Sequence, residues 1–341
     1  MRRPVGIKDV AGAAGASVGT VSNVINRPDA VTGETRRRVL SAIERLGYVR
    51  SESARQLRAG RSRMLAMLVL DMANPFFVDV ACGAEHSARA AGLGVMLCDS
   101  AESPAEEAAY LTMFSEQRVR GVLVTPADMS GRNLDVFRRH HIPFVLVDRV
   151  VPSAHGCSVS VDDVNGGALA VRHLLGRGSR EIAYVSGPTQ LAQCQDRRDG
   201  ALLALAEAGL PPGALRPVEA ARLDVVAGRD AGARLLGMAP RPDAVFCAND
   251  LLALGVLQTL YQAGVRVPQD IALVGYDDIG FASASAVPLT SVRQPAFQLG
   301  GAAAELLIEE TGDGADTHEH RRVVLRPELV VRASTLSRPR P

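Results

Sequence analysis

Polar and aromatic side chains that could hold a small molecule follow several short apolar segments of the chain. They are two amides, two carboxylates, one guanidinium and two phenyl rings: Asn74, Phe76, Phe77, Asp148, Arg197, Asn249 and Asp277. Planar polar groups bind hydroxyls through paired hydrogen bonds, and rings stack on the apolar faces of a ligand. The set suits a polyhydroxylated or heteroaromatic molecule. Taken singly, however, an Asp or Asn after a strand is more often a turn former or a helix N-cap.

The sequence contains no convincing catalytic or metal-binding set. Residues 15–19 match the G-x-S-x-G motif of α/β-hydrolases, but that motif needs a strand before its serine, and the pattern before Ser17 is helical. The adjacent histidines at 140–141 cannot both face one metal ion. We interpret His318 and His320 as solvated side chains of a polar loop. The sequence therefore predicts no catalytic residue, no metal and no cofactor.

Cysteine usage and hydropathy indicate a cytoplasmic protein. The five cysteines are odd in number and widely spaced, without a C-x-x-C pair: Cys82, Cys98, Cys157, Cys194 and Cys247. Reduced thiols fit this pattern better than disulfides or zinc. No apolar run reaches the roughly 18 residues that a membrane span needs, and the two N-terminal arginines precede no apolar core of a signal peptide.

The elements that would position these residues begin with two short helices near the N-terminus. Ile7, Val10, Ala11 and Ala14 form one apolar stripe of a helix, and Gly15 breaks the pattern. Ser17 is a suitable N-cap for a second helix, whose Val21, Val24 and Ile25 share one face. A third helix, ending at Gly47, buries Val39, Ile43 and Leu46. The pattern predicts a small helix-turn-helix domain.

The outer face of the second helix suits the major groove of DNA. It presents Val18, Gly19, Ser22 and Asn23, and the Asn23 amide can pair bidentately with adenine. Val18 could contact a thymine methyl group, and Gly19 allows a close approach. Thr20, Ser22 and the arginines are better suited to phosphate contacts, which set the register of the protein on the duplex.

Charge is distributed unevenly along the 341 residues, although the net charge is only +1. Residues 1–63 hold thirteen Lys and Arg against five acidic residues, a net charge of +8, which leaves −7 for the rest. A basic head joined to an acidic body indicates a polyanion-binding module attached to a part that avoids polyanions.

Short apolar segments alternate with helical patterns beyond residue 63, which predicts a doubly wound α/β architecture. The strand candidates are 64–71, 94–100, 121–126, 144–148, 182–187, 244–249 and 271–278. Helical patterns include 104–118, 165–177, 197–209, 250–264 and 296–310. The units are too many for one open sheet of ordinary size, so we expect two parallel-sheet lobes. Ligands of such sheets bind beyond the carboxyl ends of the strands.

Motifs along nearly the whole chain resemble those of LacI/GalR-type bacterial transcription regulators. The N-terminal stretch IKDVAGAAGASVGTVSNVIN carries the likeness first. It continues in SARQLRAGRSRMLAMLVLD, NPFF at 74–77, VLVDR at 145–149, AND at 248–250, VGYDD at 274–278 and LTSVRQP at 289–295. These motifs occur in the same order as in the family. Any one of them alone would be weak evidence of a relationship, but together they are specific.

The resemblance implies three regions. They are a helix-turn-helix domain at 1–49, a hinge at 50–63 and an effector-binding and dimerisation core at 64–341. The core would have the two lobes of a periplasmic sugar-binding protein. We expect the N-lobe at about 64–161 and 292–325 and the C-lobe at about 162–291 and 326–336, with chain crossings near 160–163, 289–293 and 322–326. The hinge would form a helix beside that of its dimer mate and insert Leu57 into the minor groove.

The resemblance also selects the site residues. The expected DNA contacts are Lys8, Ser17, Val18, Gly19, Thr20, Ser22, Asn23, Asn26, Ala54, Arg55, Leu57 and Arg58. The expected effector contacts are Asn74, Phe76, Phe77, Asp148, Arg197, Asn249 and Asp277. Purine-binding relatives close the pocket with an aromatic residue from the C-lobe, in the segment that aligns with 218–232. Here that segment offers Leu223, which favours a sugar over a purine.

The sequence thus predicts a homodimeric transcriptional regulator, acting as a repressor, that binds a near-palindromic DNA operator and responds to a small molecule, in particular a sugar. Alternatives remain. One is a sugar-binding protein without a DNA function, and another is a purine- or nucleoside-responsive regulator. A third is an enzyme on the same scaffold, which would turn over a sugar or an ester. A fourth is a non-specific nucleoid protein, whose DNA binding would depend steeply on salt and show no sequence preference.

Overall fold

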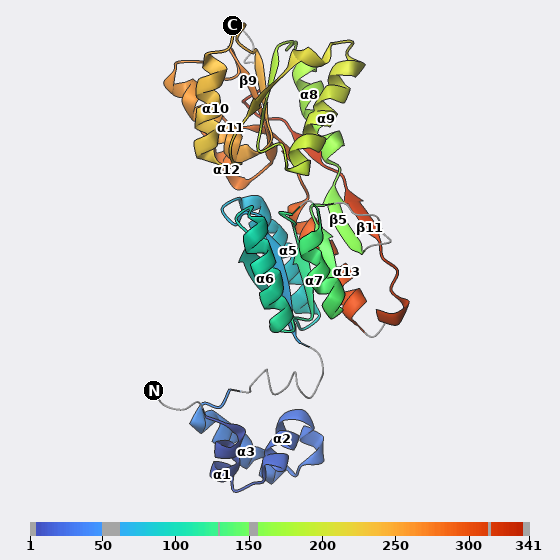
Figure 1. Cartoon of the computed structure of the whole chain (residues 1–341). Coiled ribbons are helices and arrows are strands. Elements are labelled where there is room, and N and C mark those ends of the chain that lie inside the picture. The colour runs from blue at the N-terminus through green and yellow to red at the C-terminus, as the bar shows by residue number, and fades with distance from the viewer. Residues whose placement is uncertain (1–4, 50–61, 129, 150–155, 313–314, 337–341) are drawn as a thin grey trace. The chain divides into compact units, whose positions relative to one another are not determined.

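The computed structural model describes residues 5–49, 62–128, 130–149, 156–312 and 315–336 (Figure 1). Contacts between residues divide the chain into two units, a head of Met1–Ser62 and a core of Arg63–Pro341. The predicted hinge contacts Ala54, Arg55, Leu57 and Arg58 lie outside the described residues.

The head is a bundle of short helices around one small apolar core. Its elements are α1 Ile7–Ala14, α2 Val18–Asn26, the 3-10 helix η1 Pro28–Ala30 and α3 Gly33–Leu46. Val10, Val21 and Val39, one from each α-helix, are fully buried in the same apolar cluster. Gly15 and Gly47 end α1 and α3 in left-handed conformations, which a residue with a Cβ adopts only with strain.

The core contains two six-stranded sheets. The first has the order β11-β5-β4-β3-β1-β2 and the second the order β12-β10-β9-β8-β6-β7. The strand pairs are parallel except for β10 with β12. The strands are β1 Met64–Val69, β2 Gly94–Asp99, β3 Gly121–Val124, β4 Phe144–Val147, β5 Cys157–Val161, β6 Ile182–Ser186, β7 Leu215–Glu219, β8 Ala244–Cys247, β9 Ala272–Asp277, β10 Thr290–Arg293, β11 Arg322–Leu325 and β12 Glu328–Val330.

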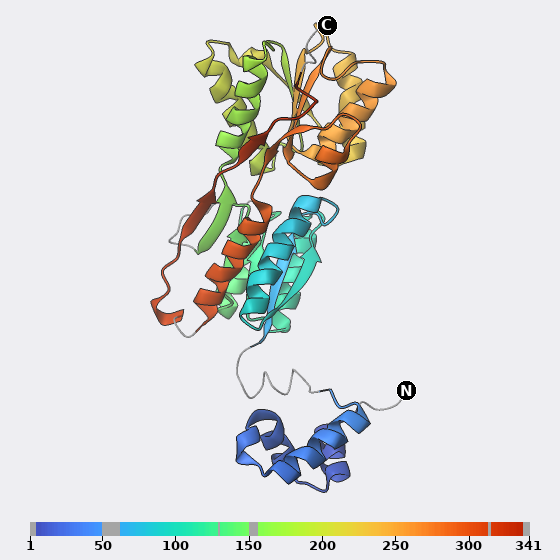
Figure 2. The same ribbon diagram turned by 180° about the vertical axis from the view of Figure 1, so that it is seen from behind.

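Helices cover both faces of each sheet (Figures 1 and 2). They are α5 Pro75–Ala90, α6 Pro104–Glu116, α7 Asp135–His140, α8 Asp163–Gly176, α9 Ala192–Glu207, α10 Val225–Leu236, α11 Asp250–Gln262, α12 Gly280–Ala284 and α13 Ala296–Thr311, with 3-10 turns η2 Arg132–Leu134, η4 Pro212–Ala214 and η5 Ala315–Thr317. In β1, Leu65 and Met67 pack towards α5 and α13, whereas Leu68 packs towards α6 and α7. Because both faces are buried, β1 is apolar at every position, as is usual for parallel sheets.

Five strands lie outside the seven segments predicted from the sequence: β5, β7, β10, β11 and β12. Three of these carry weak signals. The edge strand β7 contains Pro217, β5 buries the small polar residues Ser158 and Ser160, and β12 has three residues. Apolar runs alone cannot identify strands of this kind.

Three short links join the lobes, which we define by their sheets. The N-lobe contains the first sheet with α5, α6, α7 and α13, and the C-lobe contains the second sheet with α8 to α12. Asp162 alone separates β5 from α8, residues 294–295 separate β10 from α13, and residues 326–327 separate β11 from β12. Since β10 pairs within the second sheet, the second crossing lies just beyond the predicted 289–293.

Glycine pairs let neighbouring helices approach closely. A Cβ on Gly200 would lie 1.8 Å from the carbonyl oxygen of Val164, and one on Gly167 would lie 1.9 Å from that of Arg197. The α8–α9 contact therefore excludes every side chain larger than hydrogen at these two positions. The pairs α5–α13 and α10–α11 have equivalent glycines at Gly83, Gly300, Gly228 and Gly255.

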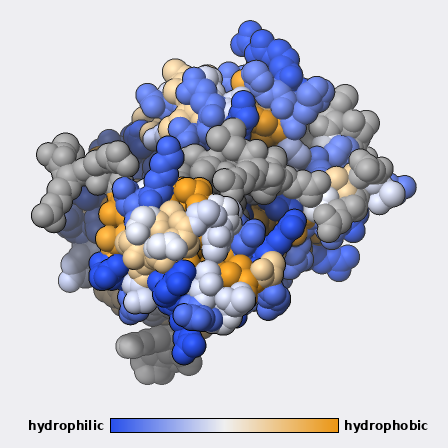
Figure 3. Space-filling model, turned by 90° about the horizontal axis from the view of Figure 1, so that it is seen from below, coloured by the Kyte–Doolittle hydropathy of each residue, from blue (hydrophilic) through white to orange (hydrophobic). Residues whose placement is uncertain are grey.

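Within the described residues, no helix has the length and apolar character needed to cross a bilayer. On the face shown in Figure 3, hydrophilic side chains predominate and small apolar areas lie among them.

Candidate functional site

A cleft between the two lobes collects side chains from the carboxyl ends of strands in both sheets. It is lined by all seven predicted effector contacts and by Leu223. Five further residues complete the lining: Leu70, Asp71, Glu102, Gln193 and Gln294. Parallel strands place their carboxyl ends at one edge, so residues from distant parts of the sequence meet there.

A buried arginine organises the C-lobe side of the cleft. Arg197 on α9 is 4% exposed, and its Nε donates to Asp163 Oδ1 at 2.8 Å. Its Nη1 donates to the Ala248 carbonyl oxygen at 2.6 Å and lies 3.9 Å from Asp277 Oδ1. The guanidinium carbon lies 3.7 Å from the centre of the Tyr276 ring, which is a cation–π contact. Arg197 is therefore fixed on several sides before any ligand arrives.

Hydrogen bonds between side chains connect the lobes across the cleft. Asn74 Nδ2, from the N-lobe, donates to Asp277 Oδ2 of the C-lobe at 3.1 Å. Gln193 Nε2, from the C-lobe, donates to Asp148 Oδ2 of the N-lobe at 2.9 Å. Gln294, in the second link, donates to Asp277 Oδ1 at 2.8 Å. Three of the predicted effector contacts, Asn74, Asp148 and Asp277, therefore also take part in hydrogen bonds that connect the lobes.

Buried polar atoms in and beside the cleft remain without hydrogen-bond partners among the described residues. They are Asp148 Oδ1, Arg149 Nε and Nη2, Gln193 Oε1 and Gln294 Oε1. Nearly all buried polar groups in native proteins are satisfied, and an unsatisfied one costs about 1–3 kcal/mol. The atoms that belong to cleft-lining residues are the acceptors of Asp148, Gln193 and Gln294, so the cleft is suited to a ligand that donates hydrogen bonds, as a hydroxyl does.

The two cleft carboxylates have unusual backbones and raised pKa values. Asp148 has φ of 57° and Asp277 has φ of 99°, in the left-handed half of conformational space. Burial, and after it the Asp163 carboxylate, raises the pKa of Asp148 to about 6. Burial also raises the pKa of Asp277 to about 6, against the opposing effect of Arg197. Desolvation therefore dominates the electrostatics of both groups.

Apolar groups form the remaining walls. Phe76 and Phe77 of the N-lobe are buried and meet edge to face, with ring centres 5.1 Å apart. On the C-lobe side, Leu223 packs over Gly187, where a Cβ would lie 2.6 Å from Leu223 Cδ2. Asn249 caps α11 through Oδ1 and donates from Nδ2 to the Leu223 carbonyl oxygen at 2.9 Å, so it positions the leucine segment.

Five polar residues at or beside this site were not predicted from the sequence: Asp71, Glu102, Asp163, Gln193 and Gln294. Asp163 was detectable in principle, because it follows the strand β5, but the alternating small residues of that strand did not reveal it. Gln193 and Gln294 lie on a helix and in a lobe link, where no strand-end rule applies.

The second candidate surface is the outer face of α2 in the head. Val18, Gly19 and Asn23 are exposed there, and Thr20 and Ser22 are half-buried. Lys8, on α1, is exposed. The Asn23 side chain forms no hydrogen bond with the described residues, which leaves its amide available to a partner.

The residues at the two ends of α2 form hydrogen bonds within the helix. Ser17 Oγ accepts from the Thr20 backbone N–H at 3.0 Å, so it forms the predicted N-cap of the helix. Asn26 Nδ2 donates to the Ser22 carbonyl oxygen at 2.8 Å.

Comparison with known proteins gives consistent matches for both units. Residues 6–51 match the model of bacterial regulatory proteins, lacI family, and residues 171–335 match the periplasmic binding protein-like domain. The HTH-type transcriptional repressor PurR of Photobacterium profundum is 36% identical over 329 residues, which cover 96% of this chain and 98% of that protein.

Solved structures are similar over almost the whole length. The complex of the transcriptional regulator CelR with cellobiose has a TM-score of 0.73 at 32% identity, covering 97% of this chain and all of that one. The lac repressor dimer bound to operator and the anti-inducer ONPF has a TM-score of 0.86 at 26% identity, covering 98% and 100%.

Replacing Asp148 by Asn should flatten the pH dependence of core stability. The raised pKa means that, between about pH 4 and 6, the folded chain holds a proton that the unfolded chain releases. The free energy of unfolding of the natural protein should therefore fall as the pH rises through this window. Asp148→Asn removes that loss and tolerates the positive φ, so relative to the natural protein it should gain roughly 1–3 kcal/mol between pH 4 and pH 7.

Urea denaturation at several pH values measures the difference. The exposed Asp230→Asn on α10 is the control and should leave the slope unchanged. Parallel pH profiles for Asp148→Asn and the natural protein would contradict the assignment.

Proposed function

Since the chain belongs to the lacI family of bacterial regulatory proteins, and is therefore a DNA-binding transcriptional repressor that a small molecule regulates, we propose that its cleft binds a sugar. The unsatisfied buried acceptors of Asp148, Gln193 and Gln294 carry this proposal. A polyhydroxylated ligand can donate to them, whereas an apolar one would leave them buried and unpaired.

The apolar walls support a sugar rather than a flat heterocycle. Phe76 and Phe77 supply rings from the N-lobe, but the C-lobe side presents Leu223, so a planar base would be stacked on one side only. The similar CelR structure contains cellobiose, a disaccharide. A purine is the second candidate, favoured by the 36% identity to a repressor named PurR.

Effector binding should raise the thermal stability of the core, and Arg197→Gln should abolish the increase. A ligand at 100 times its Kd adds about 2.7 kcal/mol to the free energy of unfolding. Removing the guanidinium leaves Asp163 and Asp277 without their cation, so the cleft loses its shape as well as a donor. A thermal-shift screen of the full chain against monosaccharides, disaccharides including cellobiose, purine bases and nucleosides measures the effect.

The adjacent Arg198→Gln is the matched control, because Arg198 is exposed on the same helix. It should keep the full ligand response. A shift with purines alone would replace the sugar by the second candidate, and an undiminished response of Arg197→Gln would remove the cleft from the proposal.

We also propose how the head reads its operator. The outer face of α2 would enter the major groove, with Asn23 pairing to adenine, while Lys8, Ser17, Thr20, Ser22 and Asn26 hold phosphates and Val18 and Gly19 approach the bases. Residues 50–63 would form the hinge, with Ala54, Arg55, Leu57 and Arg58 at the minor groove. Two heads in a dimer would then fit a near-palindromic site.

Asn23→Ala should weaken binding to the preferred operator by about 5- to 150-fold, the effect of losing one bidentate base contact of about 1–3 kcal/mol. Binding to unrelated DNA should remain the same, because phosphate contacts survive. Random-oligonucleotide selection with the natural protein supplies the operator, and fluorescence anisotropy at fixed salt measures both affinities. Ser41→Ala, exposed on α3, is the control. Equal losses on both DNAs would contradict a base-reading role.

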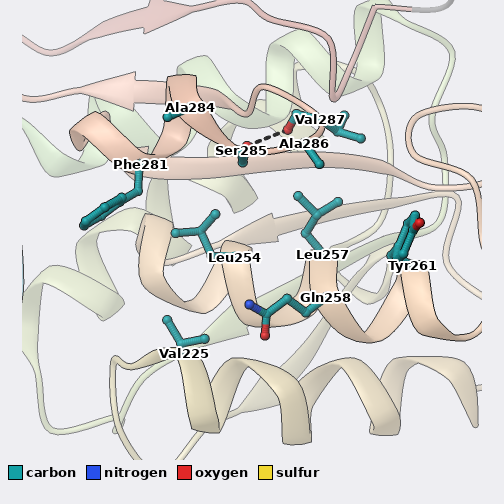
Figure 4. Close-up of a pocket in the computed structure, with 10 residues that line it drawn as sticks. All are labelled: Val225, Leu254, Leu257, Gln258, Tyr261, Phe281, Ala284, Ser285, Ala286 and Val287. Atoms are coloured by element: carbon teal, nitrogen blue, oxygen red, sulfur yellow. Dashed lines mark hydrogen bonds between the residues drawn. The ribbon is translucent and has the colours of Figure 1, made fainter.

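An apolar groove on the C-lobe supports a homodimer. It lies between α11 and α12 with the segment that follows, and its lining consists of Val225, Leu254, Leu257, Gln258, Tyr261, Phe281, Ala284, Ser285, Ala286 and Val287 (Figure 4). Tyr261 is 80% exposed and Phe281 is 61% exposed, at opposite ends of the hollow in the figure. A two-fold axis would let each copy bury its rings against the other's apolar wall.

Tyr261→Asp should shift the full chain from dimer to monomer, because a carboxylate would be buried in an apolar interface. Sedimentation velocity over a concentration series measures the change. Leu203→Asp is the matched control, since Leu203 is 47% exposed on α9, away from the groove lining. A Tyr261→Asp protein that remains dimeric would place the interface elsewhere.

The remaining proposals concern place and chemistry. We propose that the protein works in the cytoplasm, where its DNA target lies and where its five free cysteines would stay reduced. We further propose that it catalyses no reaction, which is supported by the engagement of Ser17 as a helix cap.

A further inference from the structure

Four potential metal ligands meet at the end of the N-lobe sheet, outside the cleft. Cys157 begins β5, Glu310 lies in the last turn of α13, and His318 and His320 follow η5 and precede β11. Figure 1 shows β5 and β11 side by side, and the two strands pair in parallel. The ligand atoms of all four residues lie within 4.8 Å of one another.

The interpretation of His318 as a solvated side chain is wrong, because its side chain is only 5% exposed. Cys157 is fully buried and Glu310 is partly buried, whereas His320 is exposed. The sequence does not reveal the cluster because Cys157 lies more than 150 residues before Glu310, His318 and His320.

The distances are close to those of a tetrahedral zinc site. Cys157 Sγ lies 3.1 Å from His318 Nε2 and 3.7 Å from His320 Nδ1. His318 Nε2 lies 4.0 Å from Glu310 Oε2. Bonds of about 2.3 Å to sulfur and 2.0–2.1 Å to nitrogen or oxygen, at tetrahedral angles, separate the ligand atoms by about 3.3–3.6 Å. Small side-chain rotations would bring all four atoms to one centre.

Surrounding groups would support a bound cation. The Arg321 backbone N–H donates to Cys157 Sγ at 3.3 Å, a hydrogen bond that a metal-bound sulfur can also accept. His318 Nδ1 lies 4.0 Å from Glu309 Oε2, and Arg321 in turn holds Glu309. A carboxylate behind a ligating histidine is the usual second partner that orients the ring.

The glutamate is otherwise unexplained. Glu310 Oε2 is buried and accepts no hydrogen bond from the described residues. A bound dication would give this buried carboxylate oxygen a partner, and His318 Nε2 lies 4.0 Å from it.

We propose that Cys157, Glu310, His318 and His320 bind one divalent cation of the zinc class in a closed tetrahedral site. A thiolate and two imidazoles select zinc or a similar transition metal and exclude Mg²⁺ and Ca²⁺, which prefer oxygen ligands. A thiolate and a carboxylate would neutralise the charge of the ion. With four protein ligands the site has no open position, so its role is structural: it fastens β11 and the end of α13 to β5.

Titration of the metal-free, reduced full chain with Co²⁺ tests the proposal, because tetrahedral cobalt with a thiolate ligand gives intense visible bands and a sulfur-to-metal charge-transfer band. One equivalent per chain should produce both bands, and Zn²⁺ should displace the cobalt. Cys157→Ser should abolish the charge-transfer band. His320→Gln changes an exposed residue. It should weaken Zn²⁺ binding by at least about 100-fold, since even outer partners of a metal site contribute 10- to 100-fold.

Matched controls use ligand-type residues outside the cluster. Cys82→Ser and His140→Gln, both exposed, should bind Co²⁺ and Zn²⁺ like the natural protein. The proposal is overturned if no tetrahedral cobalt spectrum appears at one equivalent, or if His320→Gln binds Zn²⁺ as tightly as the natural protein. Equal weakening by the control variants would also overturn it, because the ions would then be bound at dispersed surface sites.

Discussion

The buried contact between Arg197 and Asp163 is the interaction on which the cleft depends. A guanidinium that is 4% exposed must be matched by negative charge and acceptors, or its desolvation would cost several kcal/mol. Asp163, the Ala248 carbonyl oxygen and the Tyr276 ring supply that match, and they come from α8, the end of β8 and β9. One side chain therefore fixes three elements of the C-lobe relative to one another at the floor of the cleft.

The same contact explains the packing of the neighbouring helices. Asp163 reaches Arg197 because α8 and α9 touch through Gly167 and Gly200, where any Cβ would overlap a carbonyl oxygen. Gly166 similarly leaves room for the Tyr276 hydroxyl, 2.0 Å from the position a Cβ would take. The positions of Asp163 and Arg197 thus depend on the glycines of α8 and α9. Replacing these glycines would push the helices apart and displace the two charged side chains.

The sequence predicted the architecture well, because its strongest strands are buried on both faces and read as continuous apolar runs. It also predicted which polar residues follow those strands, and the structure brings Asn74, Asp148 and Asn249 to one cleft. It failed where the signal depends on three-dimensional contact. Gln193 lies on a helix, and Cys157 joins Glu310, His318 and His320 through the pairing of β5 with β11. Neighbouring residues in the sequence do not show either contact.

The three links between lobes limit how an effector can be sensed. One link is a single residue and the others are two residues long, and Pro295 and Pro327 have fixed φ angles. Connectors this short restrict the sliding of one lobe past the other and favour a change in the angle between the lobes. A molecule bound in the cleft would therefore be sensed as a tilt of one lobe against the other rather than as a translation.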